Sequence, residues 1–327
     1  MRPETLDLLR CPACGGALSL EGGAAAAQSL RCSACPGRYE LRGGIPRLLE
    51  AAPLEAGNLR TQQSFGFEWL AYPGPIPEED RRIFLEETQI PAEDWRGKTV
   101  LDAGCGMGRY TRVAVSLGAK VVAFDLSEAL QRVAEAGIDA VQGNLLKPPL
   151  KKGSFDIIYS QGVIHHTPDA HAVFLRLAEL LKPGGLLSVW VYGDPGSYAE
   201  FKQNPLRPGR EWLRPWMPAA YAVVWTRHQF SEALRFFTTK LPIRAVYALC
   251  GPLAALGALP VLKYLTFSVH PDFQVRRIED FDWLSPPYQS HHTRSELEGW
   301  CREAGLSPLK WLAHGLVPKP GVLARKG

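Results

Sequence analysis

The stretch that decides the fold of this chain reads Val100-Leu101-Asp102-Ala103-Gly104-Cys105-Gly106-Met107-Gly108-Arg109-Tyr110. An apolar run ends in a carboxylate, glycine then recurs at every second position, and apolar residues follow at helical spacing. This order predicts a strand, a tight turn and the start of a helix, because glycine allows a sharp turn and lets a ligand lie against the backbone. Free N–H groups at a helix N-terminus bind carboxylates and phosphates. The stretch therefore predicts a site for a nucleotide-like ligand.

The spacing of the three glycines distinguishes between classes of nucleotide. A dinucleotide site has the pattern G-x-G-x-x-G, but here Arg109 stands at the sixth place and the third glycine, Gly108, comes one place early. A nicotinamide enzyme is therefore disfavoured but stays an alternative, as does a tight turn without a ligand. The run from Gly104 to Gly108, with Asp102 two residues before it, resembles motif I of class I S-adenosylmethionine (SAM)-dependent methyltransferases.

Two further apolar strands follow in the order that this family has. The second strand ends at Asp125, 19 residues after Gly106, close to the spacing at which an acidic residue reaches a ribose hydroxyl. The alternative for Asp125 is an acid favoured by the dipole of the next helix. The third strand reaches Asn144, where the family usually has an aspartate that accepts from the adenine amino group. An amide oxygen can also accept, but it brings no charge.

The fourth and fifth strands complete the resemblance. Residues 155–161 lead into His165 and His166, and Lys182-Pro183-Gly184-Gly185 precedes an apolar run. The series resembles the "FD…LHH…LKPGG" pattern of the type 11 methyltransferase group, which implies an α/β, Rossmann-like sheet of seven strands, the last antiparallel. The resemblance implies these contacts with SAM: Asp102, Gly104, Cys105, Gly106, Gly108, Asp125, Leu126, Asn144, Leu145 and Gln161.

The N-terminal cysteines predict a metal site. Cys11-x-x-Cys14 and Cys32-x-x-Cys35 are separated by 17 residues, which fits the pattern of tetrahedral zinc. Four thiolates fill the coordination shell, so we expect a structural zinc ion whose binding supplies most of the folding energy of this small unit. Disulfides are disfavoured because no signal peptide is evident and the other cysteines are isolated, as in a reducing cytosol. We therefore expect a cytoplasmic protein.

Residues 39–49 sharpen this prediction. They resemble the ending of small zinc-ribbon proteins that partner and activate tRNA, rRNA and release-factor methyltransferases, which implies a scaffolding or partner-binding role for the ribbon. Residues 1–60 contain seven arginines and six acids, whereas a phosphate-binding surface is plainly basic because its affinity comes from counterion release. A nucleic-acid partner is therefore disfavoured. An RNA or protein methyltransferase guided by the ribbon stays an alternative.

The motifs divide the chain of 327 residues into three parts. We expect a zinc ribbon over residues 1–52, a linker and N-terminal lid helices over 53–96, and the methyltransferase domain over 97–327. A helical insertion over 195–292 separates strands five and six, at the place where the family builds its substrate pocket. A helix from Thr293 to Ala304, with Thr293 and Glu296 spaced as a capping box, is then followed by strands six and seven, the last inserted antiparallel.

The insertion indicates the class of acceptor. Residues 245–262 form an uncharged run of 18 residues, interrupted by prolines and glycines. We expect a buried, pocket-lining segment; an interfacial element in peripheral contact with a membrane is an alternative, and a transmembrane span is the least favoured one. The apolar insertion and the small net charge of +4 favour a small, hydrophobic molecule as acceptor over a nucleic acid.

Two groups of residues are candidates for chemistry at the acceptor. Residues 280–292 look like a functional loop in which Asp282, Tyr288 and His291 contact the acceptor, although a packed crossover loop is equally compatible with them. His165 or His166 is best placed as a general base, which is needed only if the acceptor must lose a proton. The alternative for both histidines is to shape the pocket. A SAM-binding scaffold without catalysis is the remaining alternative function.

Overall fold

A seven-stranded sheet forms the centre of the part of the chain that the structure describes, with strand order β10-β11-β9-β8-β5-β6-β7. The structure is a computed structural model that describes residues 1–22, 28–50, 54–72, 74, 76–194, 196, 198–202, 206, 209–259, 262, 266–268, 270–313 and 319–327. The strands of the sheet are β5 (Thr99–Ala103), β6 (Lys120–Asp125), β7 (Ala140–Gln142), β8 (Phe155–Gln161), β9 (Leu181–Trp190), β10 (Leu306–Trp311) and β11 (Gly321–Lys326).

The direction of the strands confirms the predicted fold class. The neighbours from β7 to β9 pair in parallel, whereas β11 lies antiparallel between β9 and β10. The last strand is thus inserted antiparallel, as the resemblance implied. The helix before it is also as predicted, because Thr293 and Glu296 form a capping box at its start.

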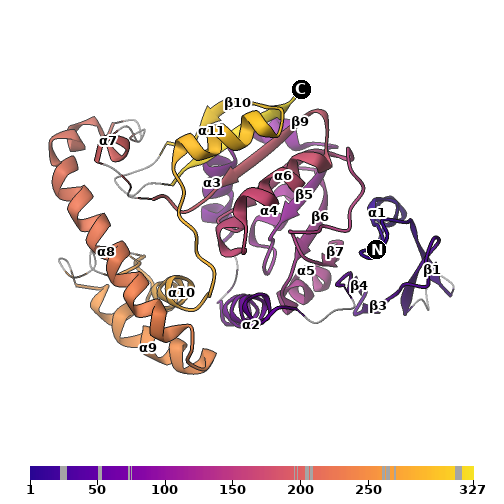
Figure 1. The fold of residues 1–327 in the computed structure, drawn as a ribbon, viewed down its shortest axis with the longest axis horizontal. Helices are drawn as coiled ribbons and strands as arrows, with labels where there is room; N and C mark the ends of the chain where they lie inside the picture. Colours follow the sequence, from indigo (N-terminus) through magenta and orange to yellow (C-terminus); the bar gives the residue numbers. More distant parts are fainter. Residues whose placement is uncertain are drawn as a thin grey trace.

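Helices cover both faces of the sheet (Figure 1). Successive side chains of a strand point to opposite faces: Val100 packs with residues of α3 and α4, whereas Leu101 packs with residues of α6 and α11. Burial on both faces explains why the strands read as continuous apolar runs. The helices packed around the sheet are α3 (Pro77–Thr88), η1 (Ala92–Trp95), α4 (Arg109–Ser116), η2 (Glu128–Leu130), α5 (Gln131–Glu135), η3 (Ile164–His166), α6 (Ala170–Leu180) and α11 (Arg294–Glu303).

The N-terminal ribbon is a separate sheet of order β1-β2-β3-β4 that lies beside β7 (Figure 1). After β4 the chain continues along β7 of the main sheet. Arg47 forms an isolated parallel β-bridge with Gln142, and the N–H of Leu48 donates to the Gln142 carbonyl at 2.9 Å. The boundary predicted at residue 52 lies outside the described residues. The elements of the ribbon are α1 (Pro3–Leu8), β1 (Leu18–Glu21), β2 (Ser29–Cys32), β3 (Arg38–Arg42) and β4 (Ile45–Pro46).

Where the structure describes it, the insertion is mostly helical, and it packs against α2 (Ala56–Ala71), which lies in the segment predicted to form a lid. Within the uncharged run, Val246, Cys250 and Ala254 are buried at helical spacing while Leu249 is half exposed. The run up to Leu256 therefore belongs to one amphipathic helix, α9, which packs on α10. No helix in the described ranges is long and apolar enough to cross a membrane. The elements of the insertion are α7 (Tyr198–Phe201), η4 (Glu211–Trp216), α8 (Met217–Thr238), α9 (Ile243–Leu256) and α10 (Phe273–Leu284).

The predicted loop over residues 280–292 is wrong in its first part. Residues 280–284 are the last turn of α10, whose start is fixed by Asp272, because its side chain accepts the N–H of Val275. The helix gives way to irregular chain at Ser285, ahead of two prolines that limit helix continuation. Asp282 is therefore held on a helix, whereas Tyr288 and His291 lie in the segment after it.

Candidate active site

The glycine loop joins β5 to α4 at the carboxyl end of the central strands. Gly104 and Gly106 have φ angles of 90° and 52°, in the left-handed region that favours glycine. A Cβ on Gly104 would lie 2.2 Å from a methyl group of Val163, and one on Gly106 would lie 2.7 Å from Nε1 of Trp69. Val163 and Trp69 therefore cover the loop directly. Gly108 precedes the first residue of α4.

The carboxyl groups of Asp125 and Asp102 make hydrogen bonds to the loop and to the helix that follows it. Asp125, at the end of β6, accepts the N–H of Gly106 at 2.8 Å and that of Ser127 at 2.7 Å. Asp102 accepts the hydroxyl of Thr111 at 2.5 Å. Burial raises the pKa of Asp125 and raises the pKa of Asp102 to about 7. The loop is thus positioned before any ligand arrives.

The other predicted SAM contacts lie at the same ends of their strands or in the turns that follow them. Cys105 and Leu145 are buried. The side-chain oxygen of Asn144 already accepts the backbone N–H two residues further on, at 2.9 Å. Gln161 donates from Nε2 to the hydroxyl of Ser188 at 2.8 Å, while its Oε1 is buried without a hydrogen-bond partner among the described residues.

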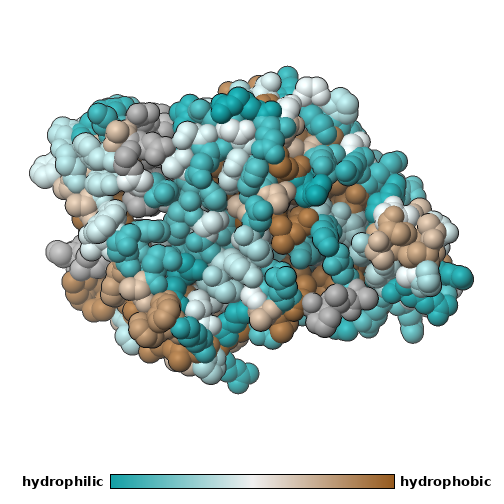
Figure 2. Space-filling model, in the orientation of Figure 1, coloured by the Kyte–Doolittle hydropathy of each residue, from teal (hydrophilic) through white to brown (hydrophobic). Residues whose placement is uncertain are grey.

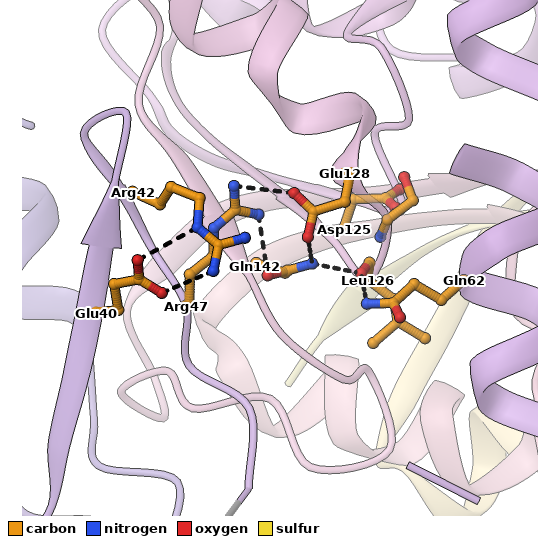
Figure 3. A network of polar contacts seen from close by, with 9 residues as sticks. Glu40, Arg42, Arg47, Gln62, Asp125, Leu126, Glu128 and Gln142 are labelled. Atoms are coloured by element: carbon orange, nitrogen blue, oxygen red, sulfur yellow. Dashed lines mark hydrogen bonds and ion pairs between the residues drawn. The ribbon is translucent and has the colours of Figure 1, made fainter. Parts of the chain in front are cut away.

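Leu126 lies at the centre of a polar network (Figure 3). Its carbonyl accepts from the side-chain amides of Gln62 and Gln142, both at 2.9 Å. The oxygen of Gln142 accepts from Arg47 at 2.9 Å, and Arg47 also pairs with Glu128 at 3.0 Å. The network joins α2, the carboxyl end of the sheet and the ribbon.

His166 is oriented by two groups from the end of the insertion. Its Nδ1 lies 3.1 Å from the carbonyl oxygen of Tyr288. A carbonyl only accepts, so Nδ1 carries the proton and the neutral ring keeps its lone pair on Nε2. That Nε2 lies 3.5 Å from Oδ1 of Asp282. Burial lowers the pKa of His166, so the ring is neutral at pH 7 and able to accept a proton.

His165 has the complementary arrangement. Its Nδ1 accepts the N–H of Tyr192 at 3.3 Å, so the proton of the neutral ring is on Nε2. The Nε2 is buried, and no partner is found for it in the described part of the chain. Burial, together with the neighbouring His166, lowers the pKa of His165 well below its ordinary value. The pair therefore offers one acceptor and one donor.

Two residues near the predicted Asp282, namely Tyr192 and Glu68, were missed by sequence reasoning. Tyr192 donates its hydroxyl to Asp282. Glu68, on α2, is buried, and burial followed by the charge of Asp282 raises its pKa well above the ordinary value. The signal was present in the sequence: Glu68 is a charged residue at helical spacing from Ser64, inside an aromatic stretch.

Tyr288 and His291 do not point to the same place. The Tyr288 hydroxyl packs against the backbone of α2, because a Cβ on Gly57 would lie 2.0 Å from it. Its carbonyl, rather than its side chain, serves His166. The ring of His291 lies 4.2 Å from that of His228. Catalytic contact of either side chain with an acceptor stays a prediction.

The four N-terminal cysteines are brought together as predicted. Their sulfur atoms all lie within 4.8 Å of one another, with Cys11 to Cys35 at 3.6 Å and Cys14 to Cys32 at 3.5 Å. Tetrahedral zinc with Zn–S bonds of about 2.3 Å sets its sulfur atoms roughly 3.8 Å apart. Backbone N–H groups also point at the sulfur atoms of Cys32 and Cys35. The donor set fits zinc.

Residues 101–189 match the family model described as a methyltransferase domain. The chain carries a methyltransferase domain. The matched residues run from β5 into β9, and they include the glycine loop, both histidines and every predicted SAM contact from Asp102 to Gln161.

Relatives of the methyltransferase domain have names of several kinds. Sterol 24-C-methyltransferase ERG6B of Gibberella zeae is 33% identical over 125 residues, 34% of this chain and 32% of that protein. A ubiquinone biosynthesis O-methyltransferase of Xanthomonas euvesicatoria is 31% identical over 147 residues, 40% of this chain and 62% of that protein. The chain thus spans less than two thirds of the length of these curated relatives. A solved SAM-dependent methyltransferase from Mesorhizobium loti has a TM-score of 0.42 and 19% identity, covering 73% of this chain and 94% of that one.

Proposed function

We propose that this protein transfers the methyl group of SAM to a small, hydrophobic acceptor. One arrangement carries the proposal: a buried, neutral His166 whose Nε2 has no hydrogen-bond partner among the described residues and lies 3.5 Å from Asp282. His166 comes three residues after Val163, which covers Gly104 of the glycine loop. A proton acceptor thus stands beside the loop at which a methyl donor would be held.

The residues of the glycine loop fit SAM. Gly104 and Gly106 carry no side chains, so only Val163 and Trp69, which pack on them, have to move for a ligand to approach the backbone. Asp125 supplies an acidic acceptor at the end of β6. Gln161 contributes a buried oxygen without a partner among the described residues. When bound, SAM supplies a methyl group on a positively charged sulfur, which is reactive without further activation. The protein therefore has to align the acceptor and exclude water.

His166 takes the proton of an acceptor hydroxyl or amine in this proposal. The Tyr288 carbonyl keeps Nε2 as the accepting atom. After the transfer the ring is a cation, and the adjacent Asp282 stabilises it. Tyr192 fixes that carboxyl group through its own hydrogen bond. Asp282 and Tyr192 are thus positioning residues, and His166 is the catalytic one.

The lid helix α2 excludes water from both halves of the site. Trp69 covers Gly106 of the glycine loop, and the ring of Phe65 lies 4.9 Å from that of His166. The two aromatic residues are four apart and therefore lie on one face of α2. We infer that this face closes over SAM and the acceptor together.

The hydrophobic character of the acceptor rests on the insertion that surrounds the histidines. Aromatic rings stack outward from His165 through Tyr192 to Trp283, with centroids 3.9 Å and 5.0 Å apart. Such a wall suits an apolar or aromatic molecule. The names of the relatives, a sterol methyltransferase and a ubiquinone biosynthesis enzyme, agree with this class.

The outer face of the insertion suits contact with an anionic lipid surface. Apolar side chains gather over α8 and α9 (Figure 2), and Phe236 and Phe237 are 63% and 65% exposed. Lys240 and Arg244, which are exposed nearby, supply positive charge. Aromatic and basic residues together are typical of peripheral membrane contact. We expect the wild-type protein to bind vesicles that contain phosphatidylglycerol and the Phe236→Ser/Phe237→Ser variant to bind them more weakly. No binding by the wild type, or equal binding by both proteins, would contradict a membrane contact at this face.

We propose a structural zinc ion at the four cysteines and an intramolecular role for the ribbon. The ribbon contacts its own methyltransferase domain through Arg2 to Asp139 and through Arg47 to Gln142. We infer that the ribbon supports its own methyltransferase domain rather than a separate partner protein. We also infer that the protein works in the cytoplasm.

The test combines binding and transfer with the full-length protein. Isothermal titration with SAM, its demethylated product and NAD identifies the cofactor; we expect micromolar binding of the first two and none of NAD. SAM labelled in its methyl group is then added to a cell extract that is separated into lipid, protein and RNA fractions. Label in the organic extract supports the proposal.

The other outcomes separate the alternatives. Label in RNA or in protein would favour an enzyme guided by the ribbon. Binding of SAM without label in any fraction would favour a scaffold. If folded, zinc-loaded protein does not bind SAM in the titration, the assignment of SAM as cofactor is overturned.

A further inference from the structure

A second group of metal-type ligands lies in the insertion, apart from the four cysteines. His228 and Glu232 are four residues apart on α8, and His291 lies in the segment between α10 and α11. Side chains four apart share one face of a helix. The ligand atoms of all three residues lie within 4.8 Å of one another.

The imidazoles of His228 and His291 lie next to each other, and that of His291 has an unpartnered nitrogen. The rings of His228 and His291 face each other edge to face, with centroids 4.2 Å apart. The Nε2 of His291 is buried and has no hydrogen-bond partner in the described ranges. Burial, followed by the nearby His228, lowers the pKa of His291 to about 3, so the ring is neutral. A buried polar atom without a partner is costly unless something binds it.

Glu232 is held in place by Arg235. The Nη1 of Arg235 lies 2.6 Å from Oε1 of Glu232, and its Nη2 donates to the carbonyls of Pro286 and Pro287. One carboxylate oxygen suffices for a monodentate ligand, and metal-binding carboxylates are usually fixed by such hydrogen bonds. The charge of Arg235 opposes a cation, so we expect weaker binding here than at four thiolates.

We propose that His228, Glu232 and His291 form a binding site for a divalent metal ion of the zinc type. Two imidazoles and a carboxylate are a donor set of catalytic zinc sites, in which the fourth position stays open for water or substrate. Tetrahedral ligands at about 2.0–2.2 Å from zinc stand roughly 3.4 Å apart. The ligand atoms are at most 4.8 Å apart, so on metal binding any pair of them has to move closer by at most about 1.4 Å.

The site is well placed to act on the histidine pair. His291 belongs to the segment whose Tyr288 carbonyl orients His166 and whose Ser290 N–H donates to the His165 carbonyl at 2.8 Å. A metal ion would tie this segment to α8. The ring of His291 also lies 5.9 Å from that of Tyr192. If the proposed methyl transfer holds, an acceptor hydroxyl on the open position would lose its proton more readily.

Metal content tests the site independently of methyl transfer. We expect full-length protein equilibrated with Zn²⁺ and desalted to contain two zinc ions per chain by mass spectrometry. The His291→Gln variant should retain one, bound at the cysteines, with its affinity for the second weakened more than about 100-fold. The matched control His171→Gln, a partly exposed histidine paired with Glu303, should still contain two. Far-ultraviolet circular dichroism establishes that each variant is folded.

Cobalt distinguishes the two sites by their donors. Co²⁺ at four thiolates gives intense charge-transfer absorption in the near ultraviolet, whereas Co²⁺ with nitrogen and oxygen ligands gives only weak visible bands. We expect the second equivalent of Co²⁺ to add weak visible bands that His228→Gln and His291→Gln both abolish. One metal ion per wild-type chain at saturation, or a second ion unaffected by both variants, would overturn the site. Preferential loading with Fe²⁺ over Zn²⁺ would overturn the zinc-type assignment.

Discussion

Arg47 donates a hydrogen bond of 2.9 Å to the side-chain oxygen of Gln142. Arg47 follows the last strand of the ribbon, and Gln142 ends β7 of the main sheet (Figure 3). The amide nitrogen of Gln142 in turn donates to the carbonyl of Leu126, the residue after Asp125. The ribbon is therefore connected to the strand ends at which we propose that SAM binds. Two successive hydrogen bonds join Arg47 to Leu126, a predicted SAM contact.

Arg47→Ala is expected to weaken SAM binding about threefold to tenfold, because a lost charged hydrogen bond costs on the order of 1–2 kcal/mol and only part of it reaches the cofactor. Isothermal titration gives the affinity. The control is Arg42→Ala: Arg42 lies in the same ribbon, but its guanidinium pairs with Glu40 and both side chains are more than half exposed, so its loss should cost little. Equal affinities in both variants and the wild type would exclude this coupling.

Cys14→Ser is expected to remove one zinc ion and to weaken SAM binding as much as Arg47→Ala does. The reason is that metal binding supplies the folding energy of a unit this small, and an unfolded ribbon cannot hold Arg47 against Gln142. The double variant is therefore expected to bind SAM no more weakly than either single one. Zinc content and titration measure both quantities. Additive losses would show that the ribbon acts on SAM by another route.

The fold was predictable because its signals are local. Val100 and Leu101 face opposite sides of the sheet, so burial on both faces leaves an apolar run that the sequence displays. Gly104 and Gly106 have positive φ angles, which the sharp turn between β5 and α4 requires of its own residues. The four cysteines keep a spacing that a tetrahedral ion imposes. Each feature depends on residues close together in the chain.

The details of the site depend on residues far apart, and these were not predictable. His166 takes its tautomer from the carbonyl of Tyr288, 122 residues away, and no sequence pattern specifies a backbone carbonyl. Glu68 lies beside Asp282 only because α2 packs on α10. His228 meets His291 for a similar reason, because α8 also packs on α10. The first part of the loop predicted for residues 280–292 is helical, because α10 begins at the cap on Asp272 and continues to Leu284.

His166→Ala is expected to keep the affinity for SAM and to lower turnover by about 10²-fold or more, the usual contribution of a general base. His171→Ala is the matched control, because this histidine of α6 pairs with Glu303 of α11 and should leave turnover unchanged. Methyl transfer to the acceptor found in the extract is the readout. Full turnover in the His166 variant would remove this histidine from the mechanism.

The pH profile of turnover gives an independent check on His166. A base must be neutral to accept a proton, and burial lowers the pKa of His166 below the ordinary 6.5. Turnover should therefore stay constant as the pH falls from 8 to about 6.5 and decline only below that value. A decline that is half complete at or above pH 6.5 in the wild type would contradict the assignment of the base.

Asp102→Asn is expected to make the protein less sensitive to alkaline pH. Burial raises the pKa of Asp102 from 3.8 to about 7 in the folded state, so between these values the folded chain binds a proton that the unfolded chain releases. The stabilisation is complete below pH 3.8 and is lost as the pH rises through 7. Each unit in this window costs about 1.4 kcal/mol of unfolding free energy.

Urea unfolding at pH 5 and pH 8 measures this effect, because asparagine keeps an oxygen for the Thr111 hydroxyl but carries no charge. The unfolding free energy of the wild type should fall by about 2–3 kcal/mol more than that of Asp102→Asn between the two pH values. Other titrating groups are common to both proteins and cancel in the difference. Asp169→Asn, at an exposed cap of α6, controls for the substitution itself. Parallel losses in the wild type and Asp102→Asn would mean that Asp102 is ionised in the folded protein.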